Sequence, residues 1–121
     1  MTFFETLLMG HLAGDWLLQS EWQARNKYRS WRALLTHVVI YHLLIFAVLL
    51  LRIGPNDARV YVVIIVLAST HALIDRRVPL IRLMRNLRIV GDAPPEPWLI
   101  LVVDQVIHIL LLGLATEYLS A

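Results

Sequence analysis

Four long apolar stretches alternate with shorter polar segments along the chain. They cover residues 3–22, 31–51, 58–75 and 98–118. Each is close to the ~17–25 residues that a helix needs to cross a bilayer. In lipid only helices and closed barrels satisfy every backbone hydrogen bond. The pattern therefore predicts an all-α polytopic membrane protein, with residues 1–121 forming a single transmembrane domain that is a bundle of about four transmembrane helices.

The four stretches are not equally apolar. Residues 34–51 of the second stretch carry no formal charge, whereas the first is interrupted by Glu5, His11, Asp15 and Gln19. The fourth begins directly after a segment that contains three of the five prolines. On hydropathy alone, the first stretch is therefore the weakest of the four expected spans.

The composition agrees with a lipid environment. Hydrophobic residues make up 59% of the 121 residues and charged residues only 17%, and the mean hydropathy is +0.66. Soluble domains carry about 25% charged residues, and a soluble domain of this size could not bury so much apolar surface. The absence of cysteine excludes disulfides, zinc–thiolate sites and thiol nucleophiles.

Nine of the eleven basic residues lie in two of the three connecting segments. Four of them separate the first and second spans, and five separate the third and fourth. Because positive loops stay in the cytoplasm, we expect both termini to lie outside, in a multi-pass protein of the bacterial cytoplasmic (inner) membrane. These charges lie at the ends of apolar stretches, so the pI of about 9.4 does not indicate a nucleic-acid partner.

The longest connection contains a periodic basic segment over residues 76–90. Apolar residues such as Leu80, Met84 and Leu87 recur there among Arg82, Arg85 and other arginines. This spacing predicts a short amphipathic helix on the cytoplasmic leaflet, with its arginines among anionic lipid headgroups. The alternative is a solvated basic loop.

Ionisable residues inside the spans recur in pairs with one spacing. His and Asp are four residues apart in three places, which puts both side chains of each pair on one helix face. The pairs are His11 with Asp15, His71 with Asp75, and Asp104 with His108. The second span adds His37, and all these residues are expected in the cytoplasmic half of the bilayer. Since such residues are costly in lipid, they usually face the interior of a bundle or a wet cavity.

Two explanations of this layer stay open. In the first, the imidazoles and carboxylates bind one or two divalent metals, for which Zn, Mn or Fe suits the mixed nitrogen and oxygen donors. Gln19 and Gln105 would then hydrogen-bond to the ligands from outside. In the second, each pair is a hydrogen-bonded clamp that fixes helix register without metal or chemistry.

Some further polar or small residues receive simpler interpretations. His42 is five residues from His37 and points about 140° away, which favours a packing or lipid-interface role. Gly10 and Gly14 form a small-xxx-small pattern that lets a neighbouring helix approach closely. Lys27 is expected in a solvated loop, with contact to an anionic substrate as the alternative.

Several motifs of the chain resemble those of a bacterial and phage membrane-protein family. The first covers residues 11–22, from His11 to Trp22, and is followed by Asn26 and Lys27. The later ones are residues 36–37, 70–75 and 104–108, in the same order as in the family. That family is known as domain of unknown function 3307. The resemblance extends over essentially the whole chain and implies an integral membrane protein with these polar positions, but it implies no activity.

The leading functional hypothesis is a metal-dependent membrane hydrolase that acts on a lipid-linked or phosphate-bearing substrate. Asp15 and His37 are its predicted catalytic residues, His37 as a further ligand or a base. The predicted metal ligands are His11, Asp15, His71, Asp75, Asp104 and His108. The alternatives are a proton- or metal-coupled carrier and a non-catalytic accessory membrane protein. Expected partners are membrane lipids and a further copy of the chain.

Overall fold

The computed structural model describes all residues from Met1 to Ala121 and is entirely helical outside its turns. Six α-helices and one π-helical segment follow one another, with no strand. They are α1 (Phe3–Leu12), η1 (Ala13–Leu17), α2 (Glu21–Asn26), α3 (Trp31–Arg52), α4 (Ala58–Asp75), α5 (Val78–Asn86) and α6 (Pro97–Ser120). The prediction of an all-α chain is confirmed.

Three of these helices, α3, α4 and α6, are long and apolar enough to cross a membrane. Their bounds agree within two residues with the stretches expected at 31–51, 58–75 and 98–118. The proline-rich segment ends at Pro97, where proline can occupy the first helical position because that residue needs no intrahelical donor.

The first apolar stretch does not form the continuous helix expected over residues 3–22. The 10 residues of α1 lead into the five of η1, and helical structure then stops at Leu17. Ser20 starts a new helix, because its hydroxyl accepts from the Gln23 amide while the Gln23 side chain accepts from the Ser20 amide. At ~1.5 Å per residue this first unit is about 22 Å long, shorter than a hydrocarbon core of ~30 Å. Four complete spans therefore remain a prediction.

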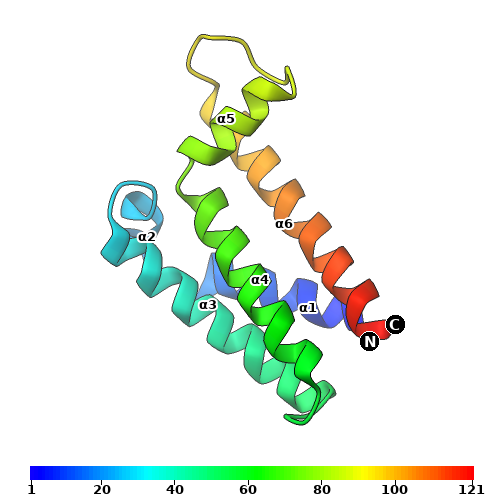
Figure 1. Cartoon of the computed structure of the whole chain (residues 1–121). Helices are drawn as coiled ribbons and strands as arrows, with labels where there is room; N and C mark the ends of the chain where they lie inside the picture. The colour runs from blue at the N-terminus through cyan, green and yellow to red at the C-terminus, as the bar shows by residue number, and fades with distance from the viewer.

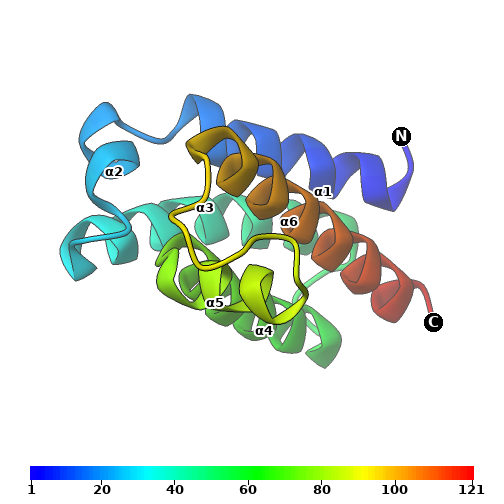
Figure 2. The ribbon, with the colours of Figure 1, turned by 90° about the horizontal axis from the view of Figure 1, so that it is seen from above.

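The helices form a closed arrangement (Figures 1 and 2). α1 packs against α3 and α6, and α4 packs against the same two helices from the other side. The short helix α2 lies against α3, and α5 lies against α4 and α6. Every long helix therefore turns one face toward a common centre.

The two basic segments share one end of the molecule, as Figure 1 shows for α2 and α5. The guanidinium of Arg76 lies 4.4 Å from the ring centroid of Trp31, and that of Arg77 lies 4.2 Å from the ring of Tyr28. At the opposite end, Arg52 donates to the carbonyl of Met1 at 3.4 Å. The basic segments thus lie at one end of the molecule and the termini at the other, and the side of the membrane that each end faces stays a prediction.

The exterior of the long helices is apolar. Leu43, Ile65 and Leu110 are 61%, 66% and 62% exposed, one on each of α3, α4 and α6. The interior holds an apolar cluster toward the termini, which includes Leu7, Ile45 and Leu112, and a polar centre described below. An apolar outside around buried charges is the arrangement expected in lipid rather than in water.

Two glycines, Gly10 in α1 and Gly14 in η1, lie where these segments pack closely against α3. A Cβ atom at Gly14 would lie 2.5 Å from Cδ2 of Tyr41, and one at Gly10 would lie 2.8 Å from Cδ1 of Ile45. A side chain at Gly14 would have to displace the Tyr41 ring, whereas one at Gly10 meets only the flexible end of Ile45. Both glycines therefore lie against α3, as the small-residue pattern predicted.

The expected amphipathic helix is present as α5. Leu80 and Met84 are buried and pack with Ile74 and Ile100, whereas Arg82 and Arg85 are exposed. The alternative of a solvated loop is therefore wrong for residues 78–86. Contact of its arginines with lipid headgroups stays a prediction.

Candidate metal centre

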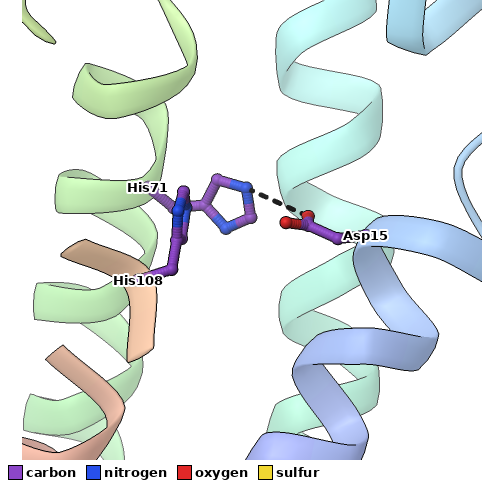
Figure 3. Close-up of side chains that lie close together, drawn as sticks. All are labelled: Asp15, His71 and His108. Atoms are coloured by element: carbon purple, nitrogen blue, oxygen red, sulfur yellow. Dashed lines mark ion pairs between the residues drawn. The ribbon is translucent and has the colours of Figure 1, made fainter. Parts of the chain in front are cut away.

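The ionisable residues singled out from the sequence meet at one place between the long helices. All seven are at most 8% exposed, and they come from α1, η1, α3, α4 and α6. They are His11, Asp15, His37, His71, Asp75, Asp104 and His108. Figure 3 shows three of them, with His71 and His108 facing Asp15 across the gap between their helices.

His37, His71 and Asp75 form a tight triangle of ligand atoms. Nε2 of His37 lies 3.1 Å from Nε2 of His71 and 3.3 Å from Oδ2 of Asp75. The third side, from His71 Nε2 to Asp75 Oδ2, is 3.0 Å. A tetrahedral ion with bonds of about 2.0–2.1 Å has ligand atoms about 3.3–3.4 Å apart. The triangle is therefore close in size to one face of such a site.

Asp15 approaches this triangle from the π-helical segment η1. Its Oδ1 lies 3.2 Å from Nε2 of His37 and 3.6 Å from Nε2 of His71, the second contact being the dashed line in Figure 3. Its Oδ2 accepts a hydrogen bond from Nε2 of Gln105 at 3.2 Å.

Three overlapping sets of ligand atoms can be drawn in this centre, each within 4.8 Å. The first is the triangle above, and the second joins Asp15 and His108 to His71. The third consists of Asp75, Asp104 and His108. The buried residues are thus one connected group rather than three separate pairs.

His11 belongs to none of these sets, because both of its ring nitrogens are engaged elsewhere. Nε2 lies 3.1 Å from Oε1 of Gln105, an oxygen that can only accept, so this nitrogen carries the proton. Nδ1 then accepts from the hydroxyl of Tyr41 at 2.8 Å. The structure brings His11 to the edge of the centre, where it holds Tyr41 and Gln105.

The two glutamines behave differently. Gln105 joins His11 to Asp15, as expected of a residue that orients a ligand. Gln19 donates instead to the backbone carbonyl of Asp15 at 3.1 Å, and its Oε1 is buried without a partner. Gln19 therefore supports the backbone of η1 rather than a carboxylate.

His42 lies closer to the centre than its helical direction indicated. It is 6% exposed, so the lipid-interface interpretation is wrong, and its ring centroid lies 4.7 Å from Tyr41 and 5.2 Å from His71. Its Nδ1 donates to the carbonyl of Val38 at 2.8 Å. The packing role expected for it agrees with these contacts.

Lys27 makes a polar contact that the sequence did not indicate. Its Nζ lies 3.0 Å from Oδ2 of Asp75, and its side chain is only 16% exposed. The expectation of a solvated loop is therefore wrong. The motif that Lys27 follows did not indicate this contact, because the position of Lys27 depends on how α2 packs against α3.

A polar cavity of about 200 Å³ adjoins the centre. Its wall includes three carboxylates and two basic side chains, namely Asp15, Asp75, Asp104, Lys27 and Arg77. Arg77 has a positive φ of 61°, which a residue with a side chain rarely adopts unless its surroundings hold it there. The cavity therefore joins the buried carboxylates to the basic end of the molecule.

A family model described as "Protein of unknown function (DUF3307)" matches residues 3–120. The chain belongs to this family. The match covers nearly the whole chain, so the resemblance seen in its motifs is confirmed. No curated protein and no solved structure matches the sequence.

The DUF3307 centre holds more carboxylates than ammonium groups. Asp15, Asp75 and Asp104 supply three carboxylates, and the ammonium of Lys27 contacts one of them, that of Asp75. With neutral imidazoles, two negative charges remain in a buried region, where unpaired charge is costly. A divalent cation would balance them. The buried His and Asp groups of the DUF3307 chain could therefore hold a metal ion, and a bound ion could activate water.

Proposed function

We propose that this protein is a metal-dependent hydrolase of the cytoplasmic membrane, acting on a phosphate-bearing or lipid-linked substrate. The observation that carries the proposal is the triangle of His37, His71 and Asp75. Its three sides of 3.0–3.3 Å are close to the spacing of ligand atoms around a tetrahedral divalent cation.

The cation would be held by two imidazole nitrogens and one carboxylate oxygen. This donor set is that of several hydrolytic zinc sites, in which a fourth position is left for water. Manganese or iron would accept the same donors. Asp75 and His71 are one helical turn apart on α4, so their relative position is fixed by the helix itself.

Asp15 is placed to act on the fourth ligand. Its Oδ1 has no hydrogen-bond partner and lies beside the triangle. A divalent cation lowers the pKa of bound water toward about 7, and a carboxylate within hydrogen-bond reach can take the proton. In this proposal Asp15 is the general base, His37 is a ligand, and His11 keeps Tyr41 and Gln105 in position.

The polar cavity would admit the substrate. It lies at the basic end, which the positive-inside rule assigns to the cytoplasm. Lys27 and Arg77 on its wall favour an anionic group, and a phosphate ester is the hydrolysable anion that a divalent cation also binds. The apolar exterior of α3, α4 and α6 would keep the centre in the bilayer, with α1 and η1 as a fourth, shorter element.

Metal analysis tests this proposal directly. The protein is purified in mild detergent without a His tag or chelator, supplied with Zn or Mn, and measured by mass spectrometry. We expect near-stoichiometric metal in the wild type and a loss of at least about tenfold in affinity for Asp75→Asn and His71→Gln. Asp92→Asn, a matched change in an exposed loop, should bind like the wild type. A wild type that binds neither metal would refute the proposal.

A second measurement separates a hydrolase from a metal-binding scaffold. Phosphate release from lipid-linked phosphates in mixed micelles is compared for the wild type and Asp15→Asn, both loaded with metal. The variant should keep its metal and lose about 100-fold or more of the rate, as removal of a general base does. Equal rates in the two proteins would exclude Asp15 as the base, and an inactive wild type would exclude this substrate class.

A proton-coupled carrier is the second candidate, and a specific observation favours it. All five histidines are buried, and their rings form a continuous series of contacts. The ring of His71 lies 5.0 Å from that of His37 and 4.6 Å from that of His108, and His108 lies 5.3 Å from His11. Such chains of titratable groups serve as proton relays in transporters. A dye assay for proton flux in liposomes distinguishes the candidates, because a hydrolase moves no protons across the membrane.

A further inference from the structure

A second group of buried ligands lies beside the proposed cation centre and shares one residue with it. Asp75, Asp104 and His108 each offer a ligand atom, and these atoms lie within 4.8 Å of one another. The side chains come from α4 and α6 and are 1%, 8% and 4% exposed. None of the three residues is held by an ionic contact with an arginine.

His108 is arranged as histidines are when they bind a metal. Its Nδ1 lies 2.8 Å from the backbone carbonyl oxygen of Asp104 and 2.7 Å from Oδ1 of the same residue. Since a carbonyl oxygen only accepts, the proton is on Nδ1 and Nε2 carries a lone pair. Metal-binding histidines donate their other N–H to a backbone carbonyl or a carboxylate in this way. Nε2 is buried without any hydrogen-bond partner, which is costly unless a cation or donor occupies that position.

One carboxylate oxygen of Asp75 is free to bind a cation in this second group. Its Oδ2 lies 3.0 Å from Nε2 of His71 and 3.0 Å from Nζ of Lys27. Its Oδ1 is buried and accepts no hydrogen bond. A carboxylate with one engaged and one unpartnered oxygen is suited to bridge two cations, one on each oxygen.

We propose that Asp75, Asp104 and His108 hold a second divalent cation, which Asp75 bridges to the first. This inference rests on the cation centre proposed above. Three protein ligands leave a position open for water or substrate, as in catalytic sites. Asp75 and Asp104 both line the polar cavity, so the open position is reached from there.

The net charge of the centre indicates what a second cation would contribute. One divalent cation balances the two negative charges that remain after Lys27 is paired with Asp75. A second cation makes the centre positive, and the cavity wall adds Arg77. Paired divalent cations stabilise both the attacking and the leaving oxygen of a phosphoester in an in-line displacement. The two-cation centre therefore selects phosphoesters over neutral esters.

The decisive experiment counts metal ions per chain. Full-length protein in detergent is titrated with Mn, and the bound metal is measured by mass spectrometry and by electron paramagnetic resonance. We expect two ions in the wild type, with a spectrum broadened by exchange coupling between them. Asp104→Asn and His108→Gln should each bind one ion and give the six-line spectrum of isolated Mn. Asp75→Asn should lose both ions.

Each other result has a definite meaning. One ion in the wild type, unchanged in Asp104→Asn and His108→Gln, would overturn the second site and leave the first intact. No ion in the wild type would overturn both proposals. Circular dichroism of each variant shows whether it is folded, and a wild type that binds fewer than two ions overturns the second site even if every variant unfolds. Asp92→Asn serves again as the matched control on an exposed loop.

Discussion

Lys27 and His71 meet at the same oxygen of Asp75: Nζ of Lys27 and Nε2 of His71 each lie 3.0 Å from Oδ2. The ammonium comes from the turn after α2, and the imidazole comes from within α4. A cation bound to that oxygen would therefore have a positive charge of the protein as its neighbour. This contact makes Lys27 a competitor of the metal and gives the first prediction.

Lys27→Met should tighten metal binding, because it removes a buried positive charge that repels the cation. We expect an increase in affinity of about tenfold, equivalent to about 1.4 kcal/mol. Competition with a chelating dye of known affinity measures this. Arg25→Met is the matched control, since the Arg25 side chain is 75% exposed and pairs with Glu21. Weaker binding in Lys27→Met would show instead that Lys27 orients Asp75 for the metal.

Gly14→Ala should destabilise the protein by about 1–3 kcal/mol, the range for overpacking a closely packed interior. The added Cβ would lie 2.5 Å from Cδ2 of Tyr41, and the Tyr41 ring cannot move freely because it packs against His71 with centroids 4.3 Å apart. Thermal unfolding in detergent measures the loss.

Gly113→Ala is the control for that change. Gly113 also lies in a helix, but the nearest side-chain atom to its added Cβ is 4.0 Å away. Because alanine favours helix over glycine by roughly 0.5–1 kcal/mol, the control should be neutral or stabilising. Equal destabilisation by both substitutions would contradict the close contact between η1 and α3.

Tyr41→Phe should lower stability by about 1–3 kcal/mol, because Nδ1 of His11 would lose the hydroxyl that donates to it in a buried site. Metal content should stay unchanged, since His11 and Tyr41 are outside the three ligand sets. Tyr61→Phe is a suitable control, because its hydroxyl donates to an exposed carbonyl of Pro55. Loss of metal in Tyr41→Phe would assign His11 to the ligands after all.

The absence of native cysteine permits a clean test of orientation. The two positions to be replaced by cysteine are exposed: Asn56 in the turn between α3 and α4, and Asn86 at the end of α5. The variants are Asn56→Cys and Asn86→Cys. In intact bacterial cells, a membrane-impermeant maleimide should label the first and not the second, because the segment after α4 carries the arginines. The control is labelling of both after the cells are lysed. Labelling of Asn86→Cys alone in intact cells would reverse the predicted topology.

The helices that depend on local pattern were predictable from the sequence. Apolar residues over 31–51, 58–75 and 98–118 specify α3, α4 and α6, because hydropathy and helix length are properties of short segments. The spacing of His71 and Asp75 put both on one face of α4, and the glycines marked the contact with α3. The break in the first stretch was less predictable, because the capping residues around Ser20 start a new helix where the apolar pattern predicts a continuous one.

Only the tertiary structure decided which of the buried residues touch one another. A helical sequence fixes which side chains share a face, but not the rotation of one helix against its neighbour, which depends on packing over the whole molecule. That rotation brings His37 to His71 and Asp75, turns both nitrogens of His11 to Tyr41 and Gln105, and draws Lys27 onto Asp75. The sequence by itself thus determined an apolar helical chain with buried His–Asp pairs, and helix packing decided which atoms could hold a cation.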